Sequence, residues 1–132
     1  MRLPPYQDRE PGELRRALRW ALRRVDMQNW TSELVLDRKA REHPSLKGKE
    51  DALGRAQVNF ERRHALVGIY RSICREDDSD PLCTVMHEAA HVLLAFREVV
   101  DPDDAFEPLF EQATEEIGLL LYALWQAEHA DG

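Results

Sequence analysis

Apolar positions in the first part of the chain recur with the period of an α-helix. Between residues 12 and 25 they fall at i, i+3, i+4, i+7, i+8 and i+11: Leu14, Ala17, Leu18, Ala21, Leu22 and Val25. This spacing predicts a helix that turns one face towards a core. Residues 1–11 contain three prolines, so we expect an extended lead-in there, followed by a single helical domain over residues 12–132.

A second periodic stretch runs from about residue 50 to residue 75 and predicts a long helix. Its apolar stripe consists of Leu53, Ala56, Phe60, Val67, Tyr70 and Cys74, with His64 on the same line. Between the two helices, residues 30–42 fit either a short helix capped at Thr31 or Ser32 or a short strand over residues 33–36. The pattern alone leaves both possibilities open.

Two more long helices are expected in the last part of the chain, at residues 81–100 and 104–129. Asp80 followed by Pro81 is a strong helix start, because aspartate caps free amide groups and proline fits the first turn. The expected core stripe of the last helix is Phe106, Phe110, Ala113, Ile117, Leu120, Leu121 and Leu124. The predicted fold class is therefore all-α, a single compact bundle of about five helices.

The composition is that of one globular domain with a hydrophobic core. A chain of 132 residues is short for two domains, and 43% hydrophobic with 33% charged residues is ordinary for a folded protein. The net charge of −7 argues against a general nucleic-acid-binding protein, whose surface would be basic. We expect no signal peptide and no membrane span, and reduced thiols at Cys74 and Cys83, which together favour the cytoplasm.

Arginines crowd the first predicted helix of this acidic protein. They occupy the positions between the apolar residues: Arg15, Arg16, Arg19, Arg23 and Arg24. Such a face could dock an acidic protein partner, a phosphate or a membrane surface. It could equally be a solvated face that pairs with the chain's own excess of carboxylates.

The candidate chemistry is concentrated in the predicted helix at residues 81–100, which contains the pattern His-Glu-x-x-His. His87 and His91 are one helical turn apart, so both imidazoles can bind one zinc ion, and Glu88 can act as general base on a metal-bound water. The same positions would also suit the solvent-facing side of an ordinary amphipathic helix, which is the alternative interpretation.

A catalytic zinc site needs a third protein ligand. Glu111 follows His91 by 20 residues, and Glu115 lies one turn later on the same side of the last predicted helix. If the last two helices form a hairpin, Glu111 could complete the metal site and Glu115 could accept a hydrogen bond from a ligand imidazole. Candidates for a transition-state stabiliser, by residue type alone, are Tyr122, His64 and His129.

The motif and its surroundings resemble a known class of enzymes. Residues 86–95, Met-His-Glu-Ala-Ala-His-Val-Leu-Leu-Ala, resemble the active-site helix of zincin metallopeptidases, and especially the helical peptidase domain of AAA-type zinc proteases. The His91-to-Glu111 spacing is similar to that of gluzincins. The resemblance implies a zinc peptidase with His87, His91 and Glu111 as ligands and Glu88 as base. Gluzincins usually place a β-sheet before this helix, and the pattern predicts none here.

Other functions are also compatible with the sequence. Di-iron helix bundles use two Glu-x-x-His pairs and two further glutamates, for which the candidates are Glu61/His64, Glu88/His91, Glu33 and Glu115. An all-α, magnesium-dependent nucleotide pyrophosphatase would likewise pair acids across antiparallel helices. A metal-free helical interaction protein would dock a partner through the arginine-rich helix. The substrate of the zinc hydrolase would be a peptide or a small molecule.

Overall fold

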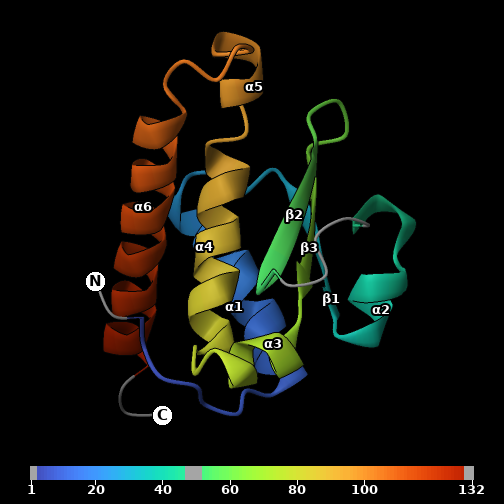
Figure 1. The fold of residues 1–132 in the computed structure, drawn as a ribbon, viewed down its shortest axis with the longest axis vertical. Helices are drawn as coiled ribbons and strands as arrows, with labels where there is room; N and C mark the ends of the chain where they lie inside the picture. Colours follow the sequence, from blue (N-terminus) through green and yellow to red (C-terminus); the bar gives the residue numbers. More distant parts are fainter. Residues whose placement is uncertain (1–2, 47–51, 130–132) are drawn as a thin grey trace.

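A computed structural model of the chain describes residues 3–46 and 52–129. Its central feature is helix α4, which lies between helix α6 and a small β-sheet (Figure 1). In chain order the elements are α1 (Pro11–Arg24), β1 (Thr31–Leu36), α2 (Arg38–Glu42), the 3-10 helix η1 (Pro44–Leu46), β2 (Gly54–Asn59), β3 (His64–Ile69), α3 (Arg71–Glu76), α4 (Pro81–Leu93), α5 (Arg97–Val100) and α6 (Glu107–Glu128).

The sheet has the strand order β1-β3-β2. Strand β1 runs parallel to β3, and β2 runs antiparallel to β3 as the other arm of a hairpin. The central strand β3 is buried along residues 65–69, because α1 and α4 cover one face of the sheet whereas α2 and η1 cover part of the other (Figure 1). In the described part of the chain, β2 is an edge strand that pairs on one side only.

The all-α prediction is wrong because residues 54–69 form a β-hairpin instead of the middle of a long helix. Residues 65–70 are an uninterrupted apolar run, which suits a strand buried on both faces as well as a buried helix. The polar residues 61–63 form the turn, where Arg63 adopts a left-handed conformation with φ of 50°. Glu61 lies in this turn and His64 begins β3, so the helical spacing behind the di-iron interpretation is absent.

The other predicted elements agree more closely with the structure. Helix α1 occupies nearly the expected range, and the lead-in over residues 3–10 has no regular secondary structure. The ambiguous residues 30–42 are a strand followed by the short helix α2. The helix expected at residues 81–100 ends at Leu93, and α5 follows as a separate short helix.

Helix α6 packs on α4 with a different face from the one expected. Its buried residues are Thr114, Gly118, Leu121 and Trp125, spaced three or four apart along one seam. Leu120 and Leu124, which were expected in the core, are exposed. None of the helices in the described part of the chain, α6 included, is both long enough and apolar enough to cross a membrane.

Asp80 ties three segments together at the start of α4. Its carboxylate accepts a hydrogen bond from the backbone amide of Leu82, which confirms the predicted cap, and Pro81 fills the first helical turn. The same carboxylate accepts from Arg9 of the lead-in at 2.6 Å and from the Tyr122 hydroxyl of α6 at 2.8 Å. The Asp80 side chain is fully buried and Arg9 is 10% exposed, so this ion pair is shielded from water.

We predict that Asp80→Ala lowers the free energy of unfolding by about 2–4 kcal/mol, because it removes the buried partner of Arg9, leaving only the more exposed Glu13, and uncaps α4. Tyr122→Phe, which removes one hydrogen bond to the same carboxylate, should cost only about 1 kcal/mol. Denaturant unfolding at pH 7 measures both values. An Asp80→Ala loss no larger than that of Tyr122→Phe would show that the ion pair is not a structural anchor.

Candidate metal centre

Helix α4 brings together His87, Glu88 and His91, which are named here the metal group because they could hold a metal ion. The two imidazole rings have their centroids 4.8 Å apart and lie nearly perpendicular, at 78°. Among the described residues, these three side chains form a group whose possible ligand atoms all lie within 4.8 Å of one another. To bind one zinc ion together, these side chains would have to rotate until their ligand atoms lie about 2.0–2.2 Å from a shared point.

Burial keeps both histidines uncharged near neutral pH. Desolvation lowers the pKa of His87 below its ordinary value, against the opposing effect of the Glu111 and Glu115 charges. Desolvation also lowers the pKa of His91, and the neighbouring His87 lowers it further. Neutral imidazoles have the free nitrogen lone pairs that metal binding requires. Both imidazoles therefore have a ring nitrogen available to a metal ion near neutral pH.

Glu88 is the most deeply buried member of the group, with 5% of its surface exposed. Burial raises the pKa of its carboxyl to about 8, an effect that the Arg55 charge reduces and the Glu111 charge increases. A carboxyl group with a pKa near the working pH can both take and return a proton, which is the requirement for a general base.

The group lies in a cleft of about 770 Å³ between the edge strand β2 and the helices α4 and α6. This volume is within the usual range of small-molecule and peptide sites. Strand β2 provides one wall, and the segment of residues 94–98 borders the end at which α4 gives way to α5. The three side chains are therefore accessible from solvent through the cleft, and an extended ligand could reach them.

Glu111 and Glu115 both line this cleft, as the predicted hairpin of the last two helices requires. Glu111 is the more closely coupled, because its charge acts on the pKa values of His87, Glu88 and His91 alike, whereas Glu115 acts on His87. The Glu111 carboxylate accepts a hydrogen bond from Arg97 at 2.9 Å and is not part of the tight three-residue group. To bind a cation shared with the histidines, Glu111 would use its other carboxylate oxygen or exchange Arg97 for the ion.

The three residues suggested by type as transition-state stabilisers lie outside the cleft lining. The Tyr122 hydroxyl donates to Asp80, and burial together with this bond raises the pKa of Tyr122 to about 12. His64 begins β3 and its ring is 2.7 Å from the Thr31 hydroxyl. His129 stacks on the indole ring of Trp125 with centroids 3.7 Å apart. The structure does not bring these side chains to the metal group.

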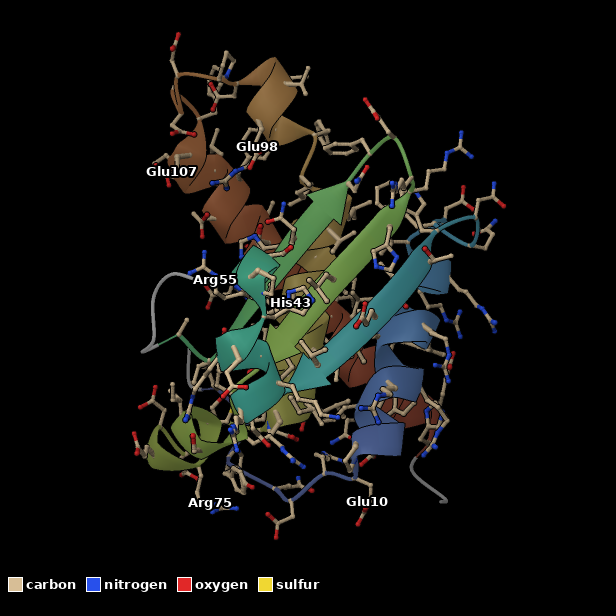
Figure 2. The ribbon with its side chains drawn as sticks, turned by 90° about the vertical axis from the view of Figure 1, so that its right-hand side faces the viewer. Glu10, His43, Arg55, Arg75, Glu98 and Glu107 are labelled. Carbon is tan, nitrogen blue, oxygen red and sulfur yellow. The ribbon has the colours of Figure 1, made fainter. Side chains whose placement is uncertain are left out.

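Two arginines of the cleft were missed in the sequence. Arg55 lies on the edge strand β2 (Figure 2), and its charge acts on Glu88, whereas Arg97 begins α5 and pairs with Glu111. Arg55 could not be found while residues 50–75 were expected to be helical. The alternation of Gly54, Ala56 and Val58, which turn towards the helices, could have identified the strand, but it does not by itself place Arg55 in the cleft.

Cys74 and Cys83 are free and buried, as expected for thiols without a disulfide. Cys83 lines the cleft, but burial raises the pKa of its thiol to about 11. In the metal-free protein it is therefore protonated near neutral pH, and as a thiol it is a poor nucleophile.

No family model, curated protein or solved structure matches this chain. The assignment of the site therefore depends on its own geometry and on the motif.

Two glycines allow the elements beside α4 to approach it at the metal group. A Cβ atom on Gly118 of α6 would lie 2.9 Å from the Cα atom of His87. On the other side, a Cβ atom on Gly54 of β2 would lie 2.7 Å from the methyl group of Thr84. Since real Cβ atoms do not approach other atoms so closely, both positions require glycine, and together they fix the turn of α4 that carries His87.

We predict that Gly118→Ala destabilises the protein by about 1–3 kcal/mol, because the added methyl group meets the backbone of α4, which cannot move aside locally. This loss should exceed the gain of roughly 1 kcal/mol that alanine normally gives in a helix. Gly12→Ala is the matched control, because there the added atom meets only the flexible end of Arg16. Denaturant unfolding should show a loss for Gly118→Ala and none for Gly12→Ala; a gain in both would contradict the close packing.

The raised pKa of Glu88 makes the free energy of unfolding depend on pH. The folded state keeps the Glu88 proton up to a pKa of about 8, whereas the unfolded chain loses it near 4.5, so this residue makes the metal-free protein less stable as pH rises between those values. Glu88→Gln removes the effect. The stability of this variant relative to wild type should therefore increase from pH 5 to pH 8, by up to about 1.4 kcal/mol per pH unit.

Denaturant unfolding in chelator at several pH values measures this difference. The histidines are present in both proteins, so their titration cancels to first order. Glu98→Gln, at an exposed position in the same cleft, is the control and should show no such trend. A Glu88→Gln difference that stays constant with pH would mean that Glu88 ionises normally.

Proposed function

We propose that this protein is a zinc-dependent hydrolase that cleaves peptide bonds. His87, His91 and Glu111 would be the ligands and Glu88 the general base. The observation that carries the proposal is the grouping of two neutral imidazoles and one buried carboxyl within 4.8 Å in an open cleft. On an ordinary solvent-facing helix surface these side chains would be exposed, and burial would not shift their pKa values.

The surroundings of the motif helix support the same proposal. The gluzincin resemblance implies a β-sheet before that helix, and in the structure β1, β2 and β3 precede α4 and pack against it. The absence of a predicted sheet was the main departure from the resemblance, and the fold removes it. The acidic pair Glu111 and Glu115 reaches the cleft from the following helix, as the resemblance also implies.

The donor set fits zinc better than magnesium or calcium. Two imidazole nitrogens and a carboxylate are typical of catalytic zinc, whereas the harder ions prefer oxygen ligands. Zinc, when bound, would supply the Lewis acidity that activates water and polarises a carbonyl group. The chain would hold the ion through its histidines, and the buried Glu88 would take the proton and pass it to the leaving amine.

Strand β2 is the reason to propose a peptide as the substrate. It borders the cleft along residues 54–58, and within the described chain its outer backbone edge has no partner strand. An extended peptide can add to such an edge through main-chain hydrogen bonds. A peptide bound there would run past the metal group and past Arg55, which also lines the cleft.

Zinc titration of metal-free protein, with a competing chelator, tests the ligand assignment. We predict that His87→Ala or His91→Ala weakens zinc binding by about 100-fold or more, and that Glu111→Gln weakens it by roughly 10–100-fold. Glu88→Gln should keep zinc but lose turnover of an unstructured protein such as casein by about 100-fold to 10,000-fold. Glu98→Gln, in the same cleft, should change neither quantity. Zinc affinity unchanged by the histidine substitutions, or turnover retained by Glu88→Gln, would refute the proposal.

A further inference from the structure

Helix α6 has a second apolar face that the described chain covers only in its middle, where Ala113 and Ile117 are half-buried and Ile117 packs on the core. It consists of residues three or four apart along one side of the helix, here named the outer stripe: Phe106, Leu109, Ala113, Ile117, Leu120 and Leu124. Leu109 and Leu120 are 63% and 59% exposed. Most of this stripe was expected to form the core, but the seam through Gly118 packs on α4 in its place. Large exposed apolar stripes on small proteins usually mark an interaction surface.

The outer stripe runs along the side of α6 that meets α1. Leu120, Leu124 and Glu128 are successive positions four apart, so they lie on one line of the helix. Glu128 accepts a hydrogen bond from the indole of Trp20 at 2.7 Å and pairs with Arg24, both on α1. The rings of Trp20 and Trp125 also touch, with centroids 5.4 Å apart. The stripe therefore continues directly into the exposed side of α1.

That side of α1 is strongly basic. All five arginines of α1 are exposed, and among them only Arg24 forms an ion pair with a carboxylate of the described chain. Arg16, Trp20 and Arg24 are four residues apart and share the edge of α1 that faces α6, with Arg19 and Arg23 beside them. The interpretation that the arginines are neutralised by the chain's own carboxylates holds for Arg24 alone among the described contacts. An uncompensated positive surface thus adjoins the C-terminal end of the outer stripe.

We propose that the outer stripe of α6 and the arginine face of α1 form a docking surface for an acidic amphipathic helix of a partner protein. The stripe extends from residue 106 to residue 124, about 27 Å of helix, and so matches the apolar face of another helix packed alongside. The arginines require acidic residues along one flank of that helix. This surface lies on the opposite side of α6 from Glu111 and Glu115, so the inference is independent of the proposed hydrolase activity.

Two synthetic peptides test the charge complementarity. Both are 18-residue amphipathic helices with leucines three or four apart; one carries glutamates on its flanks and the other carries lysines at the same positions. The whole protein has a net charge of −7, so its overall field favours the lysine peptide. We expect the glutamate peptide to bind about 10-fold more tightly in fluorescence anisotropy, and to weaken with added salt. Equal affinity, a preference for the lysine peptide, or no saturable binding overturns the proposal.

Substitutions then locate the surface. Leu120→Gln with Leu124→Gln should abolish binding, and Arg16→Gln with Arg19→Gln and Arg23→Gln should remove the preference for glutamate. All these positions are exposed, so circular dichroism should show the folded state unchanged. Val99→Gln, an equally apolar change at a 75% exposed site outside the stripe, should leave binding unaltered. Concentration-dependent dimerisation that the leucine substitutions abolish would assign the stripe to a second copy of this chain and overturn the proposal.

Discussion

The close approach of three elements at one turn of α4 is the constraint on which the rest of the structure depends. Gly118 of α6 and Gly54 of β2 contact this turn from opposite sides, next to His87 and Thr84. Because neither contact leaves room for a single methyl group, the register of α6 against α4 is fixed at this point. Glu115 and Glu111 lie one and two turns before Gly118, so the same contact brings both acids to the cleft.

This packing places the metal group in a poorly hydrated position, with electrostatic consequences. Burial lowers the pKa values of both histidines and raises that of Glu88, so the three side chains are largely uncharged without a cation. Glu111 is different, because its exposed carboxylate is balanced by Arg97. If Glu111 served as the third ligand of the proposed zinc site, the ion would act on a carboxylate that Arg97 already partly neutralises.

The sequence predicts α4 well because its signals are local. Asp80, Pro81 and the histidine spacing need no distant partner to be recognised. The hairpin of residues 54–69 was missed because the apolar run of β3 is buried by segments far away in the chain, and such a run fits helix and strand alike. The same error concealed Arg55. The packing face of α6 was missed because small residues, Thr114 and Gly118, form part of it, and a search for apolar periodicity does not detect them.

The exchange of faces on α6 explains why one helix serves two surfaces. Small residues at the seam let α6 approach the metal group closely, and the larger apolar residues are consequently turned outwards beside α1. Coupling between the two surfaces would require α6 to shift relative to α4 when either ligand binds. The contact at Gly118 opposes such a shift, because α6 lies so close to the backbone of α4 there that not even one methyl group would fit between them. Docking on the outer stripe and metal binding in the cleft should therefore be energetically independent, despite sharing a helix.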